Sequence, residues 1–154
     1  MEREALKRIF DFLEEKGEHI IPLPVKIKLA MPIAKEDLNV KGDLSLSNSD
    51  ITSLPKGLEV GGDLFLSNSN ITSLPEGLEV GGDLYLMFTT ISSLPEGLKV
   101  GGELNLFYTK ITSLPKGLKV GDSIFIRNTP LTKYSDNQLR EMIKPGFIKG
   151  DIIR

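Results

Sequence analysis

The residue types that carry most enzymatic and metal-binding chemistry are scarce in this chain of 154 residues. There is no cysteine, which excludes disulfides, thiolate metal ligands and cysteine nucleophiles. His19 is the only histidine, and a lone histidine after a helix is usually just solvated. Gly-Gly-Asp recurs as a turn, without the strand–loop–helix context of a phosphate-binding loop. These observations predict a protein that is not an enzyme and has no cofactor or metal.

Acidic residues recur every twenty positions, at Asp43, Asp63, Asp83 and Glu103. If the segments that carry them stack as strands, the carboxylates form a ladder with about 5 Å between neighbours. Such a ladder has oxygen ligands for a calcium ion and negative charge for a basic partner. We prefer the simpler interpretation, a solvated acidic row, to a metal site.

Large apolar residues interrupt the same spacing at positions where packing does not require them. Early copies have Ser-Asn where later copies have Met-Phe and Phe-Tyr. The residues of this set are Phe65, Tyr85, Met87, Phe88, Phe107, Tyr108 and Phe125. We expect them to gather on one exposed face, because exposed area rich in aromatic residues and methionine is typical of interaction sites. With Asp83 and Glu103 they form the predicted partner-binding surface. The alternative is that the rings stack on one another and shield the sheet.

A twenty-residue unit positions these side chains, and its copies start at Val40, Val60, Val80, Val100 and Val120. A fixed period of this length indicates a solenoid, in which each coil stacks on the next. The Leu-x-Leu segment alternates like a short strand with one buried face, and should pair in parallel with the next copy. In the second copy we predict that the inward residues are Val60, Leu64, Leu66, Ile71, Leu74 and Leu78.

Glycine and proline divide the unit. The Gly61-Gly62 pair predicts a tight turn at positions where no side chain is wanted. Pro75 cannot donate a ladder hydrogen bond, so the Leu-Pro-x-Gly-Leu segment is predicted to be extended or turn-like and not a second strand.

The run Leu-x-Leu-x-x-Ser/Thr-x-Ile-x-x-Leu-Pro resembles the leucine-rich repeat in its short bacterial form, over residues 40–139. The resemblance implies an α/β solenoid of five coils with one parallel β-sheet, a concave binding face and a bacterial or phage origin. One position departs from the family, because the inward corner after the strand commonly holds Asn. Here it holds hydroxyl side chains that should bond to nearby backbone: Ser49, Ser69, Thr89, Thr109 and Thr129.

Residues 2–16 are predicted to form an amphipathic helix that ends at Gly17. Its apolar stripe consists of Leu6, Ile9, Phe10 and Leu13. Because an end coil exposes its core, we expect this stripe to cover the first coil. A helix that binds a partner is the alternative.

Residues 20–39 are predicted to lead into the first coil with an edge strand, because Val25, Ile27 and Leu29 alternate between prolines. The single domain then consists of an N-terminal cap (1–39), the repeats (40–139) and a C-terminal cap (135–154).

The C-terminal cap is predicted to combine a helix and a strand. Ser135 and Gln138 fit a capping box at the start of the helix, and Pro145-Gly146 ends it. The segment Phe147 to Ile153 repeats the spacing of Val60 and Leu64, so we predict a partial sixth strand that closes the sheet edge.

Charge and hydropathy narrow the kinds of partner. The chain has 19 basic and 21 acidic residues, without the footprint expected for nucleic acid or an anionic membrane. The first residues lack an apolar signal segment, so we expect a cytoplasmic protein, in a bacterial cell or delivered into a host cell. The sequence predicts a module that binds another protein through its aromatic face, as a monomer or weak homo-oligomer. A sugar-binding surface and self-association through the same face are the alternatives.

Overall fold

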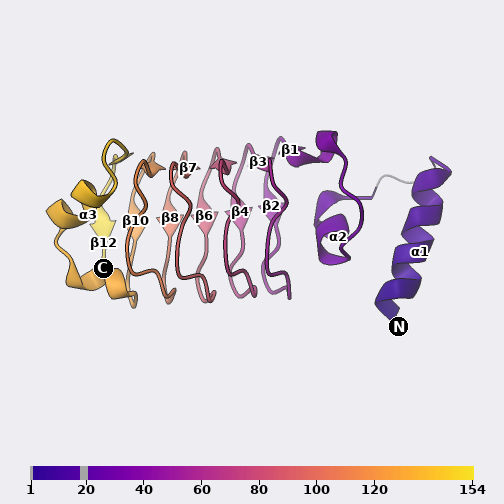
Figure 1. Ribbon diagram of the computed structural model, residues 1–154, viewed down its shortest axis with the longest axis horizontal. Coiled ribbons are helices and arrows are strands. Elements are labelled where there is room, and N and C mark those ends of the chain that lie inside the picture. Colours follow the sequence, from indigo (N-terminus) through magenta and orange to yellow (C-terminus); the bar gives the residue numbers. More distant parts are fainter. Residues whose placement is uncertain (1, 18–20) are drawn as a thin grey trace.

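The computed structural model describes residues 2–17 and 21–154, and in it the twenty-residue units stack as the coils of a β-solenoid (Figure 1). The interpretation of His19 falls outside the described residues. Equivalent strands of successive coils pair in parallel and in register, for example Leu64 with Leu84 and Val60 with Val80. The predicted parallel stacking is therefore confirmed.

The strands form two six-stranded parallel sheets, which corrects the prediction of one. The Leu sheet contains the Leu-x-Leu segments, in β2 (Leu44–Ser45), β4 (Leu64–Phe65), β6 (Leu84–Tyr85), β8 (Leu104–Asn105), β10 (Ile124–Phe125) and β12 (Ile152–Ile153). The Val sheet contains the residue pair that opens each coil, in β1 (Asn39–Val40), β3 (Glu59–Val60), β5 (Glu79–Val80), β7 (Lys99–Val100), β9 (Lys119–Val120) and β11 (Phe147–Ile148).

The strands of both sheets have two residues each, but the Val sheet escaped prediction because the sequence marks each of its strands with one repeated apolar residue, whereas Leu-x-Leu shows a full alternation. In β5, Val80 is buried and Glu79 is exposed. The segment before it is turn-like, as predicted, since the Leu78 N–H donates to the Pro75 carbonyl at 3.3 Å. Proline thus excludes a strand from its own segment and not from the residues that follow.

The core is a set of apolar ladders between the two sheets. The six inward residues predicted for the second copy are all buried, at 7 % exposure or less. The corner hydroxyls bond as predicted: Thr89 Oγ1 donates to the Leu86 carbonyl at 2.8 Å, and Ser69 Oγ donates to the Leu66 carbonyl at 2.6 Å. Every buried side-chain nitrogen and oxygen of the described residues has a hydrogen-bond partner, so the core carries no unpaired polar group.

The Gly-Gly-Asp triplet joins each coil to the one before it. A Cβ on Gly81 would overlap the carbonyl oxygen of Gly61, so the backbones approach too closely for any other residue. A Cβ on Gly82 would overlap the carboxylate of Asp63. That carboxylate accepts a hydrogen bond from the backbone N–H of Asp83 at 2.8 Å. The two glycines therefore make room for the neighbouring coil and for its acidic side chain.

The N-terminal region is helical where the sequence predicted a strand. Helix α2 (Leu23–Lys28) replaces the expected alternation, with Pro22 at its N-cap and a second proline in its first turn, where proline is tolerated. Three alternating residues were too few to separate strand from helix. The short helix η1 (Lys35–Leu38) then leads into β1, which pairs with β3.

Helix α1 (Glu2–Glu15) forms as predicted but does not cover the first coil, which corrects its expected role. Leu6, Ile9 and Phe12 of α1 are among the exposed large apolar residues. Leu23 and Ile27 of α2 pack against the core instead. The sequence of a helix predicts which of its sides is apolar. The packing of the neighbouring segments decides whether that side is covered.

The C-terminal cap contains η2 (Pro130–Lys133), α3 (Asp136–Met142), β11 and β12. The predicted capping box is confirmed: the Gln138 N–H donates to Ser135 Oγ at 3.1 Å, and the Ser135 N–H donates to Gln138 Oε1 at 2.9 Å. The single predicted edge strand is instead two, so this segment closes both sheets. Among the described residues no helix is long and apolar enough to cross a membrane.

Candidate binding surface

The outward side chains of the Leu sheet bring the predicted aromatic residues together in pairs. Phe65 and Tyr85 stack with ring centroids 5.0 Å apart and an interplanar angle of 3°. Phe107 and Phe125 meet edge to face at 5.7 Å. These four residues and Met87 are partly buried. Neighbouring coils thus hold their aromatic rings in contact, and part of each ring shields the sheet, as the alternative interpretation expected.

Phe88 and Tyr108 form a third pair at the corner after the Leu sheet, with centroids 4.7 Å apart and an interplanar angle of 16°. Both residues are about half exposed, at 52 % and 51 %. Both have φ of +57°, in the left-handed region. In the other coils this corner holds asparagine with nearly the same φ: Asn48 (+53°), Asn68 (+56°) and Asn128 (+56°). Asparagine tolerates this conformation, whereas bulky residues there are strained.

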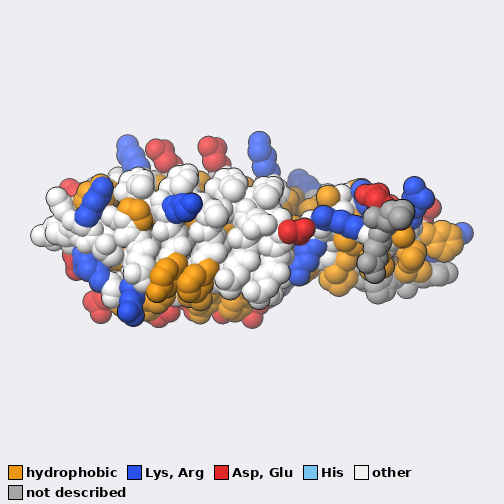
Figure 2. All heavy atoms as spheres, turned by 90° about the horizontal axis from the view of Figure 1, so that it is seen from below, with side chains coloured by type: hydrophobic (Ala, Val, Ile, Leu, Met, Phe, Trp, Pro, Cys, Tyr) orange, Lys and Arg blue, Asp and Glu red, His pale blue; other side chains and the backbone are white. Residues whose placement is uncertain are grey.

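The seven predicted residues lie on one side of the solenoid, on the Leu sheet and its corner, and we call them the aromatic surface. In Figure 2 hydrophobic side chains gather below the middle of the solenoid. Figures 1 and 2 both show the coils stacked in a nearly straight row, which corrects the expected concave face to a nearly flat one. A flat apolar surface offers area to a macromolecule more than enclosure to a small ligand.

The acidic ladder is a structural feature of the repeat. Asp83 Oδ1 accepts from the backbone N–H of Glu103 at 2.7 Å, and Asp43 Oδ1 accepts from the N–H of Asp63 at 2.8 Å. Within the described residues no group of acidic or other side chains has the arrangement of a metal site. The ladder is thus in register as predicted, and its three aspartates bond to the next coil.

Asp83 also fixes one ring of the aromatic surface. The Tyr85 hydroxyl donates to Asp83 Oδ2 at 3.0 Å. This hydrogen bond, together with burial and the negative charge of Asp83, Asp63 and Glu103, raises the pKa of Tyr85 to about 12. With Oδ1 bonded to the next coil and Oδ2 bonded to Tyr85, Asp83 supports the surface from within more than it offers charge to a partner.

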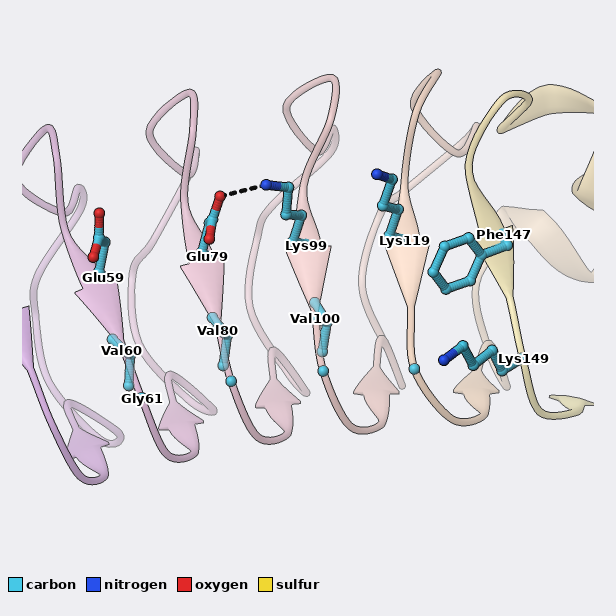
Figure 3. A pocket seen from close by; sticks show the side chains of 13 residues that line it. Glu59, Val60, Gly61, Glu79, Val80, Lys99, Val100, Lys119, Phe147 and Lys149 are labelled. Atoms are coloured by element: carbon cyan, nitrogen blue, oxygen red, sulfur yellow. Dashed lines mark hydrogen bonds and ion pairs between the residues drawn. The ribbon is translucent and has the colours of Figure 1, made fainter.

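Sequence reasoning missed a second surface, the outer face of the Val sheet, where a groove of about 470 Å³ runs across the strands (Figure 3). Its floor is the column of turn glycines and its side is a row of charged residues from successive coils: Glu59, Glu79, Lys99 and Lys119. Phe147 and Lys149 close the C-terminal end. The signal was present in the sequence as a charged residue before four of the five repeated valines, Val60, Val80, Val100 and Val120.

The groove has fewer features that indicate a bound ligand than the aromatic surface has. Lys99 donates to the Glu79 carboxylate at 2.6 Å, so opposite charges neutralise one another at its centre (Figure 3). The Lys149 ammonium lies 5.5 Å from the Phe147 ring centroid, a cation–π contact. Its glycines are already explained by the close approach of the coils. The groove therefore follows from the way the coils stack.

These features define a repeat-based parallel β-solenoid with an aromatic surface in which Phe88 and Tyr108 are about half exposed. Comparison with protein-family models, curated proteins and solved structures finds no significant match. Function must therefore be argued from the residues of this chain.

Proposed function

We propose that this chain is a five-coil solenoid of the leucine-rich-repeat type that binds another protein through the aromatic surface and catalyses no reaction. The supporting observation is the placement of Phe88 and Tyr108, two large exposed rings on backbone with φ of +57°. The same corner accepts asparagine in three other coils, so neither fold nor core requires a ring there.

The energetic balance favours a role outside the fold. A left-handed conformation costs a residue other than glycine roughly 1–2 kcal/mol, and asparagine least. Stacking of the two rings contributes roughly 0.5–1.5 kcal/mol, which at most offsets that cost. Strained residues persist where surrounding structure holds them, and they cluster at functional sites. Half-exposed rings that give the fold no net benefit are well suited to become buried at an interface.

The chemistry of the surface favours a protein over a sugar. Sugar recognition needs polar groups beside the rings, and Asn105 is the polar residue between Tyr85 and Phe125 in the row. Its Oδ1 already accepts from the Phe107 N–H at 3.1 Å. Phenylalanine, tyrosine and methionine on a nearly flat face match the composition at the centre of protein interfaces.

The test compares the parent with the Phe88→Asn/Tyr108→Asn variant, which carries residues that the same corner already accommodates. Both proteins, immobilised at equal density, are used to capture proteins from lysate of the source organism, and each candidate is then purified and its affinity measured. We expect the parent to retain a partner that the variant binds roughly thirtyfold more weakly, about 2 kcal/mol for hot-spot aromatic residues.

Two outcomes would reject the proposal. One is a partner that binds the parent and a correctly folded variant equally well, because the contact surface would then lie elsewhere. The other is a variant that unfolds, because the rings would then be structural. Light scattering of the purified parent and variant also separates partner binding from self-association. If the chain self-associates through these rings, the mass of the parent should rise with concentration and the mass of the variant should not.

A further inference from the structure

The acidic ladder and the aromatic rings are neighbouring rows on the outer face of the Leu sheet. Asp83 stands two residues before Tyr85, so the two side chains lie on the same side of the strand, about 7 Å apart along it. Their side chains meet, since the Tyr85 hydroxyl donates to Asp83 Oδ2 at 3.0 Å. The coils repeat this arrangement in register, as the pairing of Phe65 with Tyr85 shows. A partner that covers the rings therefore also lies beside the carboxylates.

The outward positions of this face are predominantly negative. Asp151 holds the ladder position in the last coil, because the next residue, Ile152, pairs with Ile124. The face carries one basic side chain, Arg127, and a row of carboxylates that belong to Asp43, Asp63, Asp83, Glu103 and Asp151. Acidic side chains appear along the lower margin of the solenoid in Figure 2, beside hydrophobic ones.

The charged residues around the margin of the face do not reverse this sign. Arg154 donates to the Asp136 carboxylate at 2.5 Å, so its charge is compensated. Lys149 lines the groove on the Val sheet, and Lys41 holds the equivalent position in the first coil. The other margin residues are two acidic and one basic: Asp50, Asp122 and Lys110. The face is thus acidic as a whole, although the net charge of the chain is only −2.

Part of this negative charge is available to a second molecule. Asp83 is charged but uses both oxygens within the fold. Asp63 uses one oxygen, which accepts from the Asp83 N–H, and among the described residues nothing bonds to its other oxygen or to the Glu103 carboxylate. The charge also reaches the rings, because Asp63 and Glu103 contribute to the raised pKa of Tyr85. Cations are therefore attracted to the same face that offers the aromatic rings.

We propose that the partner of the aromatic surface presents a basic and apolar segment, whose arginine side chains bond to the ladder while its apolar side chains cover the rings. This inference rests on the proposed function and names the chemistry of the partner. Arginine suits the face twice, since its guanidinium group bonds carboxylates and stacks on aromatic rings. The same charge repels nucleic acid and anionic membranes. A second copy of the chain placed face to face would oppose its own carboxylates.

A pair of labelled peptides tests the proposal by fluorescence anisotropy. Both are amphipathic helices with the same leucine positions, and the polar positions hold arginine in one and glutamate in the other. A helix along the solenoid axis fits the rows, because its turns repeat every ~5.4 Å and the coils every ~4.8 Å. We expect the parent to bind the arginine peptide, more weakly as salt increases, and not the glutamate peptide.

Two isosteric variants place the charge on the face. Asp63→Asn/Glu103→Gln removes two negative charges and keeps the side-chain oxygen that accepts from Asp83, so it should melt like the parent and bind the arginine peptide roughly tenfold more weakly. The matched control, Glu76→Gln/Glu96→Gln, removes the same charge from the exposed residues after Pro75 and Pro95, away from the Leu sheet, and should bind like the parent.

The outcomes separate this proposal from the proposed function. No binding of the arginine peptide to the parent, equal binding of both peptides, or equal effects of the two charge variants would overturn it. If a captured partner is lost in Phe88→Asn/Tyr108→Asn but bound fully by Asp63→Asn/Glu103→Gln, the proposed function stands and only the basic chemistry of the partner is refuted. If the ring variant binds both the captured partner and the arginine peptide like the parent, both proposals fail.

Discussion

Single polar residues in this protein are held either by their own coil or by the coil that follows. The corner hydroxyls bond within their own coil, as Thr109 does to the Leu106 carbonyl at 2.8 Å, whereas the ladder carboxylates bond across to the next coil. The corner residues Phe88 and Tyr108 differ from both, because their backbone conformation suits asparagine and their rings lie half in solvent. The energetic cost of the aromatic surface is therefore localised at two positions.

Replacing these two rings should not destabilise the fold. In Phe88→Asn/Tyr108→Asn we expect the free energy of unfolding to stay the same or rise by up to about 1 kcal/mol, because relief of left-handed strain outweighs lost stacking. Urea denaturation measures the difference. The matched control, Asn68→Ala, places a poorly tolerated residue at φ +56° and should lose about 1 kcal/mol. A large loss in the double variant would show that the rings hold the coils together.

The raised pKa of Tyr85 predicts an alkaline limit to stability. The folded chain holds this proton up to about pH 12, whereas the unfolded chain releases it near the ordinary value of 10.0. Stability from this group is therefore fully present below pH 10 and is lost as pH rises through about 12. Absorbance titration of tyrosinate should show a late phase that disappears in Tyr85→Phe and remains in Tyr108→Phe. If the late phase persists without Tyr85, the hydrogen bond to Asp83 does not control it.

At the scale of elements, the strands marked by the twenty-residue period were predicted from the sequence. The elements marked only by shorter patterns were missed. The Leu sheet was predicted because the positions of Leu64 and Leu66 hold apolar residues in every coil, and both side chains lie on one buried face. The Val sheet was missed because Glu79-Val80 is too short to show alternation, and α2 because a few alternating residues also fit a helix after proline. The left-handed corner had a signal that was overlooked, the repeated asparagine in three coils.

The glycine of the turn supplies a prediction with its own control inside the repeat. A Cβ on Gly82 would overlap the Asp63 carboxylate and crowd the backbone of Gly62, whereas a Cβ on the equivalent Gly42 would meet nothing within 4 Å. We expect Gly82→Ala to lose several kcal/mol, about 2 or more, and Gly42→Ala to stay within about 0.5 kcal/mol of the parent. Thermal melting of the two variants compares them. Equal melting temperatures would mean that the coils can move apart without cost.

At the scale of the whole molecule, the N-terminal end of the solenoid is covered by a different element from the one first expected, and the C-terminal end is covered by the predicted helix. The first coil is covered by α2, whose Leu23 and Ile27 pack on the core, and the last by α3, whose Leu139 is fully buried. Helix α1 lies beyond the cap. How far a helix extends can be inferred from the chain, but which surface it covers depends on contacts that no local pattern records.

Truncation separates these roles. Removal of residues 1–17 should change the free energy of unfolding by no more than about 1 kcal/mol, because the apolar side of α1 is exposed already. Removal of residues 1–38 should cause aggregation or a loss of several kcal/mol, roughly the cost of several uncovered core residues. Both are measured by dilute urea denaturation, where any dimer has dissociated. If the shorter truncation is also destabilising, α1 covers core after all.

The hydrogen bonds between coils have a direction, and this has a consequence for the growth of the molecule. Each aspartate of the ladder accepts from the coil that follows, as Asp63 accepts from Asp83 and Asp83 accepts from Glu103, so the junctions between the first four coils share the same bond. Duplication of one twenty-residue segment would therefore create a new junction that matches the old ones. Each duplication would lengthen the solenoid by about 4.8 Å, the spacing of neighbouring strands, and leave both caps unchanged. The length of the solenoid can therefore change in equal steps of one coil.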